Sequence, residues 1–380
     1  MHLPPFEDFL KYIVLICSFL GIPLGVMKVH VKFYIFLLEV TLMLAGEVCF
    51  CIYMFRDKRL LELTQLAPCA AIGALSILKI SYIASKQEKV NNLIFSLRNL
   101  YERIMNNENR RKIAFKSIRF LYAFLNIYVI LNVFLIMIYN FSSLFIMLYH
   151  YLEEDEIVYM LPYALLLPFS TDTWFTWIPV YIFSITAGFL CVAFYTSVDL
   201  LYYVLTSHVC NHFTLIANEL QYFDGTDENE LRDIIIRHQY ILKLSKDLNE
   251  IFTMPNFFNV VVGSLQICAL GFNLTIGGPS QIIGVLLFLI IVLLQMFVMC
   301  LFGETLMRES ERVGDAAYMC LWYNKDIRIK KDILLIIRRS NKIQILTAYK
   351  FSDISYNCFT KIISTSWTYF TLLKTVYMNR

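Results

Sequence analysis

Charged residues are scarce in this sequence, and so are glycine and proline. Only 17% of the 380 residues are Asp, Glu, Lys or Arg, whereas a soluble globular domain has about a quarter. There are 13 glycines and 9 prolines, the net charge is +3, and the 10 cysteines are dispersed along the chain. These numbers argue against a disordered chain, a nucleic-acid-binding protein and a disulfide scaffold.

Apolar residues are abundant instead. Hydrophobic residues make up 58% of the chain and aromatic residues 16%, and the mean hydropathy is +0.60. One water-soluble core cannot bury so many apolar side chains without leaving large apolar patches on its surface. The composition therefore predicts a membrane protein.

Seven stretches are long enough to cross a bilayer, which needs roughly 20 apolar residues of helix. They are 33–55, 63–85, 120–148, 178–206, 257–278, 282–303 and 354–377. We therefore predict an all-α membrane protein with seven transmembrane helices. The apolar run Tyr12–Leu24 is too short to span, so we expect a cytosolic or interfacial helix at the N-terminus.

The basic residues predict the orientation of these spans. Connections on one side, including the N-terminal segment, contain 24 Lys and Arg, and those on the other side contain 4. Because basic residues are retained on the cytoplasmic side, we expect a cytoplasmic N-terminus and an extracellular C-terminus. The long outer loop, 141–177, is acidic and begins at the sequon Asn140-Phe-Ser142. We expect glycosylation at Asn140, and a second sequon starts at Asn273.

The inner face is predicted to hold a helical bundle. Segments 229–254 and 304–350 lack proline and contain only Gly314 as a helix breaker, so the membrane helices should extend into the cytosol. The expected organisation is an N-terminal helix in 1–32, four spans in 33–206, a cytosolic extension in 207–256, two spans in 257–303, cytosolic anchor helices in 304–352, and a last, pore-lining span in 353–380.

No sequence pattern indicates catalysis. The chain lacks a P-loop, a Rossmann glycine pattern, a nucleophile elbow and a Cys-x-x-Cys pair, so we expect neither an enzyme nor a cofactor. His208 and His212 have a spacing that suits a metal, but no third ligand lies near them in the sequence. We therefore predict no metal site.

Ionisable residues within the spans usually have a partner or a function. Glu39 and Lys79 fall at similar depth in the first two spans, and we hypothesise an ion pair between them. Asp199 has no assigned partner, and Glu47 is predicted to face an aqueous vestibule in the outer half.

The last span has a face of hydroxyl groups. Thr360, Ser364, Thr368, Thr371 and Thr375 fall within about 80° of arc on an α-helix. A water-facing pore wall and a helix-packing stripe both fit this pattern.

The C-terminal quarter resembles the sixth and seventh spans of insect odorant receptors. The residues concerned are Cys300-Leu-Phe302-Gly303, Glu309-Ser310, Ala316-Ala-Tyr318, Leu346-Thr-Ala348-Tyr-Lys350-Phe-Ser352 and Thr365-Ser366-Trp367-Thr368-Tyr369-Phe370. Gustatory receptors end similarly but differ after Thr-Tyr, where this chain has Lys374-Thr375-Val376. The shared co-receptor has a larger loop than 207–256, so the resemblance indicates a tuning subunit.

The resemblance implies a ligand-gated, non-selective cation channel in the plasma membrane of a sensory neuron. It implies a heterotetramer with the odorant co-receptor, gated by the last span. The gate positions of the family fall on Leu372 and Val376, and Thr375 falls where the co-receptor has a pore-facing Gln. We expect Thr365, Thr368, Leu372, Thr375 and Val376 to share the pore-lining arc.

A volatile ligand should bind within the outer half of the bundle, because the outer face has almost no protein mass. By the geometry of the family, the candidates are Gly73, Ile77, Phe134, Ile138, Tyr181, Ile185, Phe189 and Leu286. Phe169, Trp174 and Trp177 of the outer loop are predicted to form a lid, although aromatic residues also anchor proteins at membrane interfaces.

Three alternatives remain open from the sequence: a gustatory-receptor-like channel, a G-protein-coupled seven-helix receptor and a transporter. The predicted cytoplasmic N-terminus opposes the second. The third would need internal repeats or broken helices around a midplane site, and no convincing repeat is found.

Overall fold

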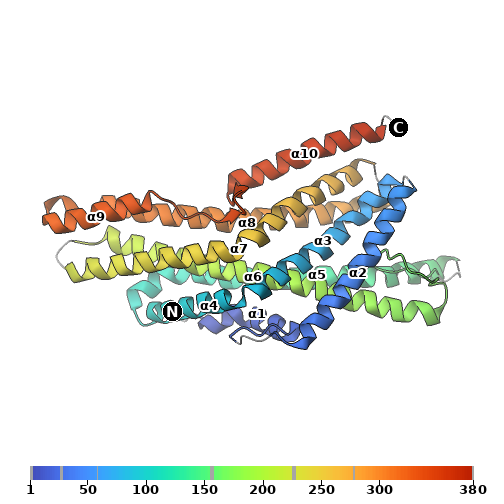
Figure 1. Ribbon diagram of the computed structural model, residues 1–380, viewed down its shortest axis with the longest axis horizontal. Helices are drawn as coiled ribbons and strands as arrows, with labels where there is room; N and C mark the ends of the chain where they lie inside the picture. The colour runs from blue at the N-terminus through green and yellow to red at the C-terminus, as the bar shows by residue number, and fades with distance from the viewer. Residues whose placement is uncertain are drawn as a thin grey trace.

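The computed structural model describes residues 3–25, 29–57, 59–154, 158–224, 228–276 and 279–378. Within these ranges the chain is almost entirely helical (Figure 1). The helices are α1 Phe6–Leu20, α2 Val31–Arg56, α3 Leu60–Ser85, α4 Gln87–Met105, α5 Glu108–Glu154, α6 Trp174–Gln221, α7 Glu228–Ile276, α8 Pro279–Met319, α9 Ile327–Ser340 and α10 Tyr356–Met378. A short 3₁₀ turn, Trp322–Asn324, precedes α9, and the strands β1 Thr347–Ala348 and β2 Ser352–Asp353 form an antiparallel hairpin.

Six helices in the described ranges are long and apolar enough to cross a membrane, namely α2, α3, α5, α6, α7 and α8. They contain the first six predicted spans. The seventh predicted span is α10, a 23-residue helix that is less apolar than these six. Its row of Thr and Ser residues, together with Lys361 and Lys374, accounts for this lower hydropathy.

Four helices are far longer than a bilayer is thick. Helices α5, α6 and α7 have 47, 48 and 49 residues and α8 has 41. At 1.5 Å per residue each is about 60 to 75 Å long, roughly twice the thickness of the hydrocarbon core. The helical extension predicted over 229–254 is confirmed, whereas 304–350 divides into the end of α8, the separate helix α9 and the first strand of the hairpin.

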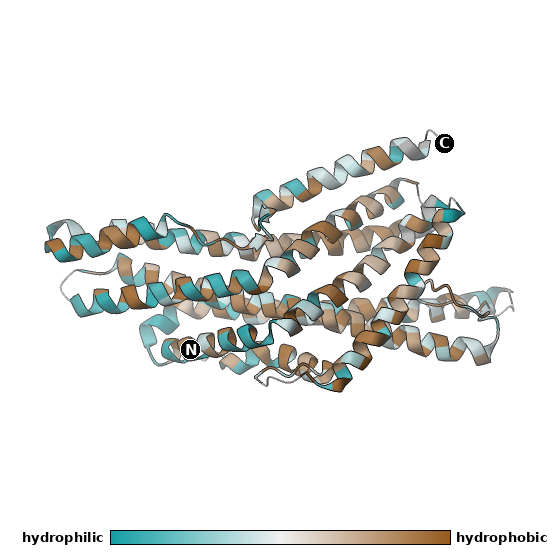
Figure 2. Ribbon diagram, viewed as in Figure 1, coloured by the Kyte–Doolittle hydropathy of each residue, from teal (hydrophilic) through white to brown (hydrophobic). Residues whose placement is uncertain are grey.

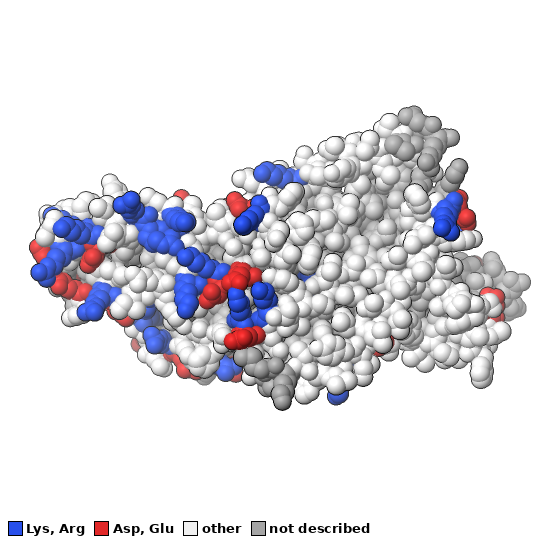
Figure 3. Space-filling view, in the orientation of Figure 1, with Lys and Arg blue, Asp and Glu red and all other residues white. Residues whose placement is uncertain are grey.

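The extensions pack with α4 and α9 into a region that we call the polar bundle. Hydrophilic residues gather at this end of the molecule, while the half with α2 and α3 is mostly apolar (Figure 2). On the face shown, most charged side chains lie over the polar bundle, and the opposite half is largely free of them (Figure 3). The chain thus separates a lipid-compatible half from a water-compatible half.

Helix α6 lies at the centre of the fold. It contacts α1, α2, α3, α4, α5, α7 and α8, and every residue from 196 to 213 is buried. Its apolar residues are spread around the whole circumference, which is typical of a helix surrounded by protein. The other long helices pack against it.

The N-terminal helix α1 docks on the polar bundle and does not span. Its buried face includes Phe6, Phe9 and Ile13. Phe6 and Phe9 contact the ring of His208 on α6, with centroids 4.9 and 5.2 Å away. Tyr101 of α4 donates a hydrogen bond of 2.6 Å to the carbonyl of Pro4. Burial raises the pKa of Tyr101 to about 12, so the phenol keeps its proton.

Candidate functional site

Helix α10 is the least covered of the predicted spans. It contacts α7 and α8 and leans away from the rest of the molecule (Figure 1). Its buried stripe is narrow and consists of Cys358, Ile362, Ser366 and Phe370 at spacings of four. Ser366 donates a hydrogen bond of 3.0 Å to the carbonyl of Ser264 on α7, and Phe370 packs with Cys268 and Phe272.

The predicted hydroxyl face of α10 is exposed. The side chains of Thr360, Ser364, Thr365, Thr368, Thr371 and Thr375 are all exposed. Thr368 and Thr375 donate to the carbonyls of Ser364 and Thr371 one turn earlier, so their hydroxyls are satisfied within the helix. The stripe therefore packs against no other described helix of this chain.

The predicted gate residue Leu372 is also exposed, at 62%. The side chain of Val376 lies outside the described residues. Leu372, Thr365 and Thr368 thus all lie on the part of α10 that its own chain leaves uncovered.

The start of α10 is fixed to the polar bundle. Asn249 of α7 accepts a hydrogen bond of 2.8 Å from the amide of Thr347 in β1, and Glu304 of α8 accepts one of 3.1 Å from the amide of Tyr356. Gly303 of α8 lies so close to Ile354 that a Cβ would collide with its carbonyl. The position of α10 is therefore coupled to α7 and α8.

The predicted ligand positions divide into two groups. Gly73 and Tyr181 are buried, and Ile77, Ile185 and Phe189 are partly buried. Phe134, Ile138 and Leu286 are instead exposed, at 61%, 52% and 43%. Their helices α5 and α8 turn these side chains away from the interior, so the structure does not place these three residues in a pocket within the chain.

A segment of the outer loop enters the bundle beside the buried candidates. Residues 158–173 contain no helix or strand, and Tyr163 at their centre is buried. Tyr163 donates a hydrogen bond of 2.9 Å to the side-chain carbonyl of Asn140, and its ring lies 5.2 Å from that of Tyr139. Gly188 of α6 makes room for it, because a Cβ there would collide with the Tyr163 oxygen.

Asn140 is fully buried, which opposes the expectation that it is glycosylated. Its amide nitrogen is directed at the carbonyl of Ile185, 3.5 Å away, and its backbone carbonyl accepts from Tyr181. A glycan on that nitrogen would require the packing to open. The second sequon is similar, since Asn273 is buried and its side chain bonds to Thr64.

Of the predicted lid residues, Trp177 is buried and Phe169 is exposed at 51%. Trp177 stacks on Tyr181 with centroids 4.5 Å apart and donates to the carbonyl of Met160. Trp174 meets Trp177 edge-on at 5.6 Å. The two tryptophans cap the outer end of this cluster, whereas Phe169 contacts neither ring in the described structure.

The hypothesised ion pair between Glu39 and Lys79 is wrong. Lys79 pairs with Asp199 of α6, and both side chains are buried. Gln295 and Tyr128 donate to the other carboxylate oxygen at 2.9 and 3.3 Å, and the ammonium group lies 4.0 Å from the ring centroid of Tyr195.

Glu39 instead accepts a hydrogen bond from Thr186. Equal depth could not identify the right partner, because it does not tell which helix faces which. Asp199 belongs to α6, the central helix, which packs against α3.

Glu47 is buried in the apolar half, at 6% exposure. Its carboxylate points toward Gly73 of α3, where a Cβ would lie 3.7 Å from one oxygen. The structure gives it no hydrogen bond or ion pair with any described residue. The side chain is largely covered by protein, and the aqueous vestibule stays a prediction.

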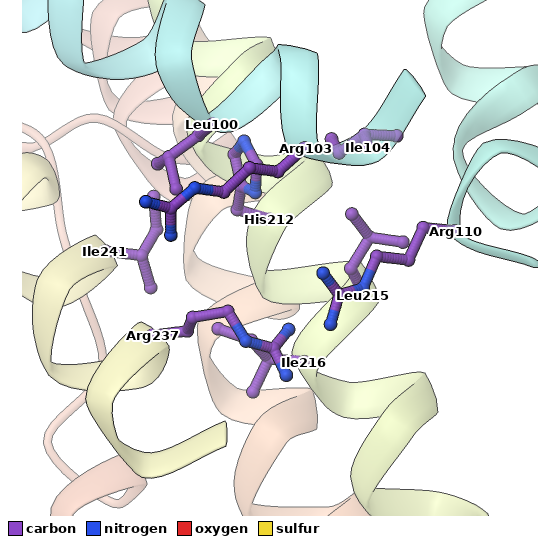
Figure 4. Close-up of a pocket in the computed structure, with 9 residues that line it drawn as sticks. All are labelled: Leu100, Arg103, Ile104, Arg110, His212, Leu215, Ile216, Arg237 and Ile241. Carbon is purple, nitrogen blue, oxygen red and sulfur yellow. The ribbon is translucent and has the colours of Figure 1, made fainter. Parts of the chain in front are cut away.

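A small hollow in the polar bundle is lined by arginines and aliphatic side chains (Figure 4). Arg110 of α5 donates to Glu219 of α6 at 2.7 Å, and Arg237 of α7 binds both Glu219 and Asp233. One carboxylate thus joins three helices. His212 lines the same hollow, and the described residues contain no group of three possible metal ligands.

The fold and the sequence together identify the class of protein. A family model described as 7tm Odorant receptor matches residues 60–367. The chain therefore belongs to the insect odorant receptor family, which are multi-pass membrane receptors and not enzymes.

Individual relatives agree with this assignment. The chain is 26% identical to Odorant receptor 85b of Drosophila melanogaster, over 92% of this chain and 91% of that protein. It is 28% identical to Putative odorant receptor 92a of the same species, over 91% and 88%. The solved olfactory receptor OR5 of Machilis hrabei in complex with eugenol superposes with a TM-score of 0.80 at 14% identity, covering 98% of both chains.

Proposed function

We propose that this chain is the odorant-binding subunit of a ligand-gated, non-selective cation channel in the plasma membrane, assembled with the odorant co-receptor in a heterotetramer. The observation that supports this proposal best is the uncovered face of α10. Its uncovered face combines hydroxyl groups with Leu372, and no other described helix of the chain packs against it. Such a face suits a water-filled route shared between subunits.

The proposed orientation puts the polar bundle in the cytosol and the outer loop outside. It is supported by the 24 basic residues on one set of connections against 4 on the other. The long helices place that basic set at the polar bundle, away from the loop that holds Tyr163. The co-receptor would then meet this chain through α10 and the cytosolic helices next to it.

The proposed ligand site is the cluster of buried side chains in the outer half. The positions retained from the sequence prediction are Gly73, Ile77, Tyr181, Ile185 and Phe189, with Trp174 and Trp177 as a cap. Tyr163, Asn140 and Tyr139 join them in the structure. The OR5 neighbour, whose structure contains eugenol, supports a small volatile organic ligand for this chain.

Opening is proposed to occur by displacement of α10. An apolar ring at Leu372 and Val376 would close the route by dewetting, and moving it outward would admit hydrated cations. The ligand must bind the open arrangement more tightly than the closed one, because equal affinity shifts no equilibrium. The contacts of α7 and α8 with the start of α10 offer a path for this coupling.

The first experiment is co-expression with the co-receptor and exposure to a panel of volatiles. We expect inward cation current within milliseconds that persists in excised patches without nucleotides. A current that requires GTP would support a G-protein-coupled receptor instead and would overturn the proposal.

The pore wall is tested by cysteine substitution on α10. A charged, water-soluble thiol reagent should block odorant-evoked current in Thr368→Cys and Leu372→Cys. Ser366→Cys is the matched control, because Ser366 is buried against α7 on the opposite face. Equal block in all three variants, or in none, would contradict a pore wall at this face.

A further inference from the structure

Glu47 is the one carboxylate in the apolar half whose burial the fold leaves unexplained. It is 6% exposed within α2. The other two acidic side chains in the membrane-spanning helices near it have partners, since Asp199 binds Lys79 and Glu39 accepts from Thr186. Among the described residues, none donates to Glu47. Glu47 is therefore about as buried as Asp199 but, unlike Asp199 and Glu39, has no partner among the described residues.

An unpartnered carboxyl at this depth is expensive. Removing it from water without a compensating hydrogen bond costs several kcal/mol, whether it is charged or not. Ionisable groups inside membrane helices are therefore rare unless they have a function. A leucine of similar size at this position would avoid the desolvation penalty. Packing alone therefore does not explain why a carboxyl group is present.

The titratable groups around Glu47 include no basic side chain, and most of them are bonded to other residues. These groups are the thiols of Cys51, Cys69 and Cys191 and the phenols of Tyr139 and Tyr163. Tyr139 and Cys69 bond to each other at 2.9 Å, and Tyr163 donates to Asn140. The carboxylate therefore has acceptor capacity that this chain does not use.

One wall beside Glu47 is formed by the loop segment 158–173, which contains no helix or strand. Leu165 packs on Gly46, next to Glu47, and Leu166 donates a backbone hydrogen bond of 3.2 Å to the Gly46 carbonyl. This loop segment has no helical or strand hydrogen bonding of its own. On the opposite side, Gly73 presents no side chain to the carboxylate. A small molecule that displaces the loop can therefore reach Glu47.

We infer that Glu47 accepts a hydrogen bond from the ligand, and that the ligand class is volatile alcohols, phenols and amines. The inference rests on the proposed function, because it names the ligand chemistry of the same outer-half site. The ligand's donor satisfies the carboxylate, while its hydrocarbon part occupies the apolar surroundings. Volatiles of the same size without a donor, such as ethers, leave the carboxylate unsatisfied and bind more weakly.

The test uses isomers that differ in the donor alone. The probes are 1-hexanol against 1-methoxypentane and phenethyl alcohol against benzyl methyl ether, with hexylamine as a cationic donor, applied to cells that express the chain with the co-receptor. Each alcohol should be more potent than its ether. In Glu47→Leu the alcohol and amine should lose about 10- to 100-fold in potency, and the ethers should not.

Two further variants keep the result interpretable. Glu47→Gln keeps the size and an acceptor, so the alcohols should retain their potency while hexylamine loses it. Glu39→Gln is the matched control, because Glu39 lies on the same helix and accepts a hydrogen bond from Thr186. The alcohol-to-ether selectivity of this variant should equal that of wild type. Surface labelling and ligand-dependent thermal stability of the purified chain report folding and binding apart from current.

The two hypotheses fail in different ways. A wild-type complex that gives no odorant-evoked current with any volatile overturns the proposed function. A wild-type complex that responds, but prefers the ethers or keeps its alcohol-to-ether ratio in Glu47→Leu, overturns the role of Glu47 and leaves the channel intact.

Discussion

At the scale of single residues, the interior of the apolar half depends on a few polar contacts with well-defined partners. Lys79 and Asp199 neutralise each other, and Gln295 and Tyr128 use the remaining acceptor capacity of the carboxylate. The four side chains come from α3, α6, α8 and α5. A fully satisfied network of this kind specifies how the helices are arranged, whereas a partly satisfied one destabilises the fold.

Removing one partner of the Lys79–Asp199 pair should be costly. We expect Lys79→Ala to destabilise the purified protein by about 3 to 5 kcal/mol, because it leaves a buried carboxylate without its cation. Thermal unfolding in detergent measures the effect. Lys89→Ala removes the exposed pair with Glu250 and should leave the unfolding temperature nearly unchanged, because water screens that pair. Equal losses in the two variants would contradict a structural role for the buried pair.

At the scale of elements, the outer loop behaves as a part of the bundle. Tyr163 and Leu165 contact Asn140 of α5 and Gly46 of α2, and the carbonyl of Met160 accepts a hydrogen bond from Trp177 at the start of α6. At the other end of the membrane half, the β1–β2 hairpin fixes the start of α10 to α7 and α8. Both attachments join a short irregular segment to long helices, and both lie next to proposed functional parts.

The docking of the loop depends on the absence of a side chain at residue 188. Gly188→Ala should force Tyr163 out of its site and cost about 1 to 3 kcal/mol, as overpacking does elsewhere. Thermal unfolding measures this, and a shifted odorant preference should accompany it. Gly284→Ala in α8 is the control, because a Cβ there meets no atom within 4 Å. If Gly188→Ala were as stable and as selective as Gly284→Ala, the loop would not be docked as described.

At the scale of the whole molecule, charge and apolar surface are separated along the long helices. The polar bundle holds most of the charged side chains on the face shown (Figure 3). Glu219 of α6 binds Arg110 of α5 and Arg237 of α7 there, and so ties the three helices together. Because such a surface is stable only in water, the membrane must surround the other half. The separation fixes the depth of the protein in the bilayer, and the basic residues predict its direction.

The direction can be measured directly. An epitope placed after Arg380 should be labelled by antibody on intact cells, because the proposed topology puts that end outside. An epitope inserted within the α8–α9 connection, at residue 325, should be labelled only after permeabilisation. Labelling in the reverse pattern would refute the proposed orientation and the channel model together.

The sequence was sufficient for most of the architecture. The first six spans are confirmed, and α7 continues through 229–254, which lacks proline and glycine. The segment 304–350 is helical only in part, since α8 ends at Met319 and α9 covers Ile327–Ser340. These features follow from local composition, since the bilayer requires a long apolar helix and water favours a charged one. The resemblance in the C-terminal quarter also identified the family correctly.

Contacts between helices were harder to predict, because they depend on how each helix is rotated about its axis. Sequence depth paired Lys79 with Glu39, but α3 turns Lys79 toward Asp199 on α6. Phe134, Ile138 and Leu286 were assigned to a pocket and are exposed, and Asn140 was assigned to the surface and is buried. The role of Tyr163 had no local signal, since it depends on where a loop without helix or strand folds back.

The sequence by itself determined that this protein spans a membrane with helices and belongs among insect odorant receptors, because hydropathy and motif residues can be read directly from the amino-acid sequence. Only the tertiary structure decided which polar groups meet inside it. The rotation and packing of the helices pair Lys79 with Asp199, bury Asn140 beneath Tyr163 and leave Glu47 without a partner among the described residues. Local sequence does not specify how helices rotate and pack.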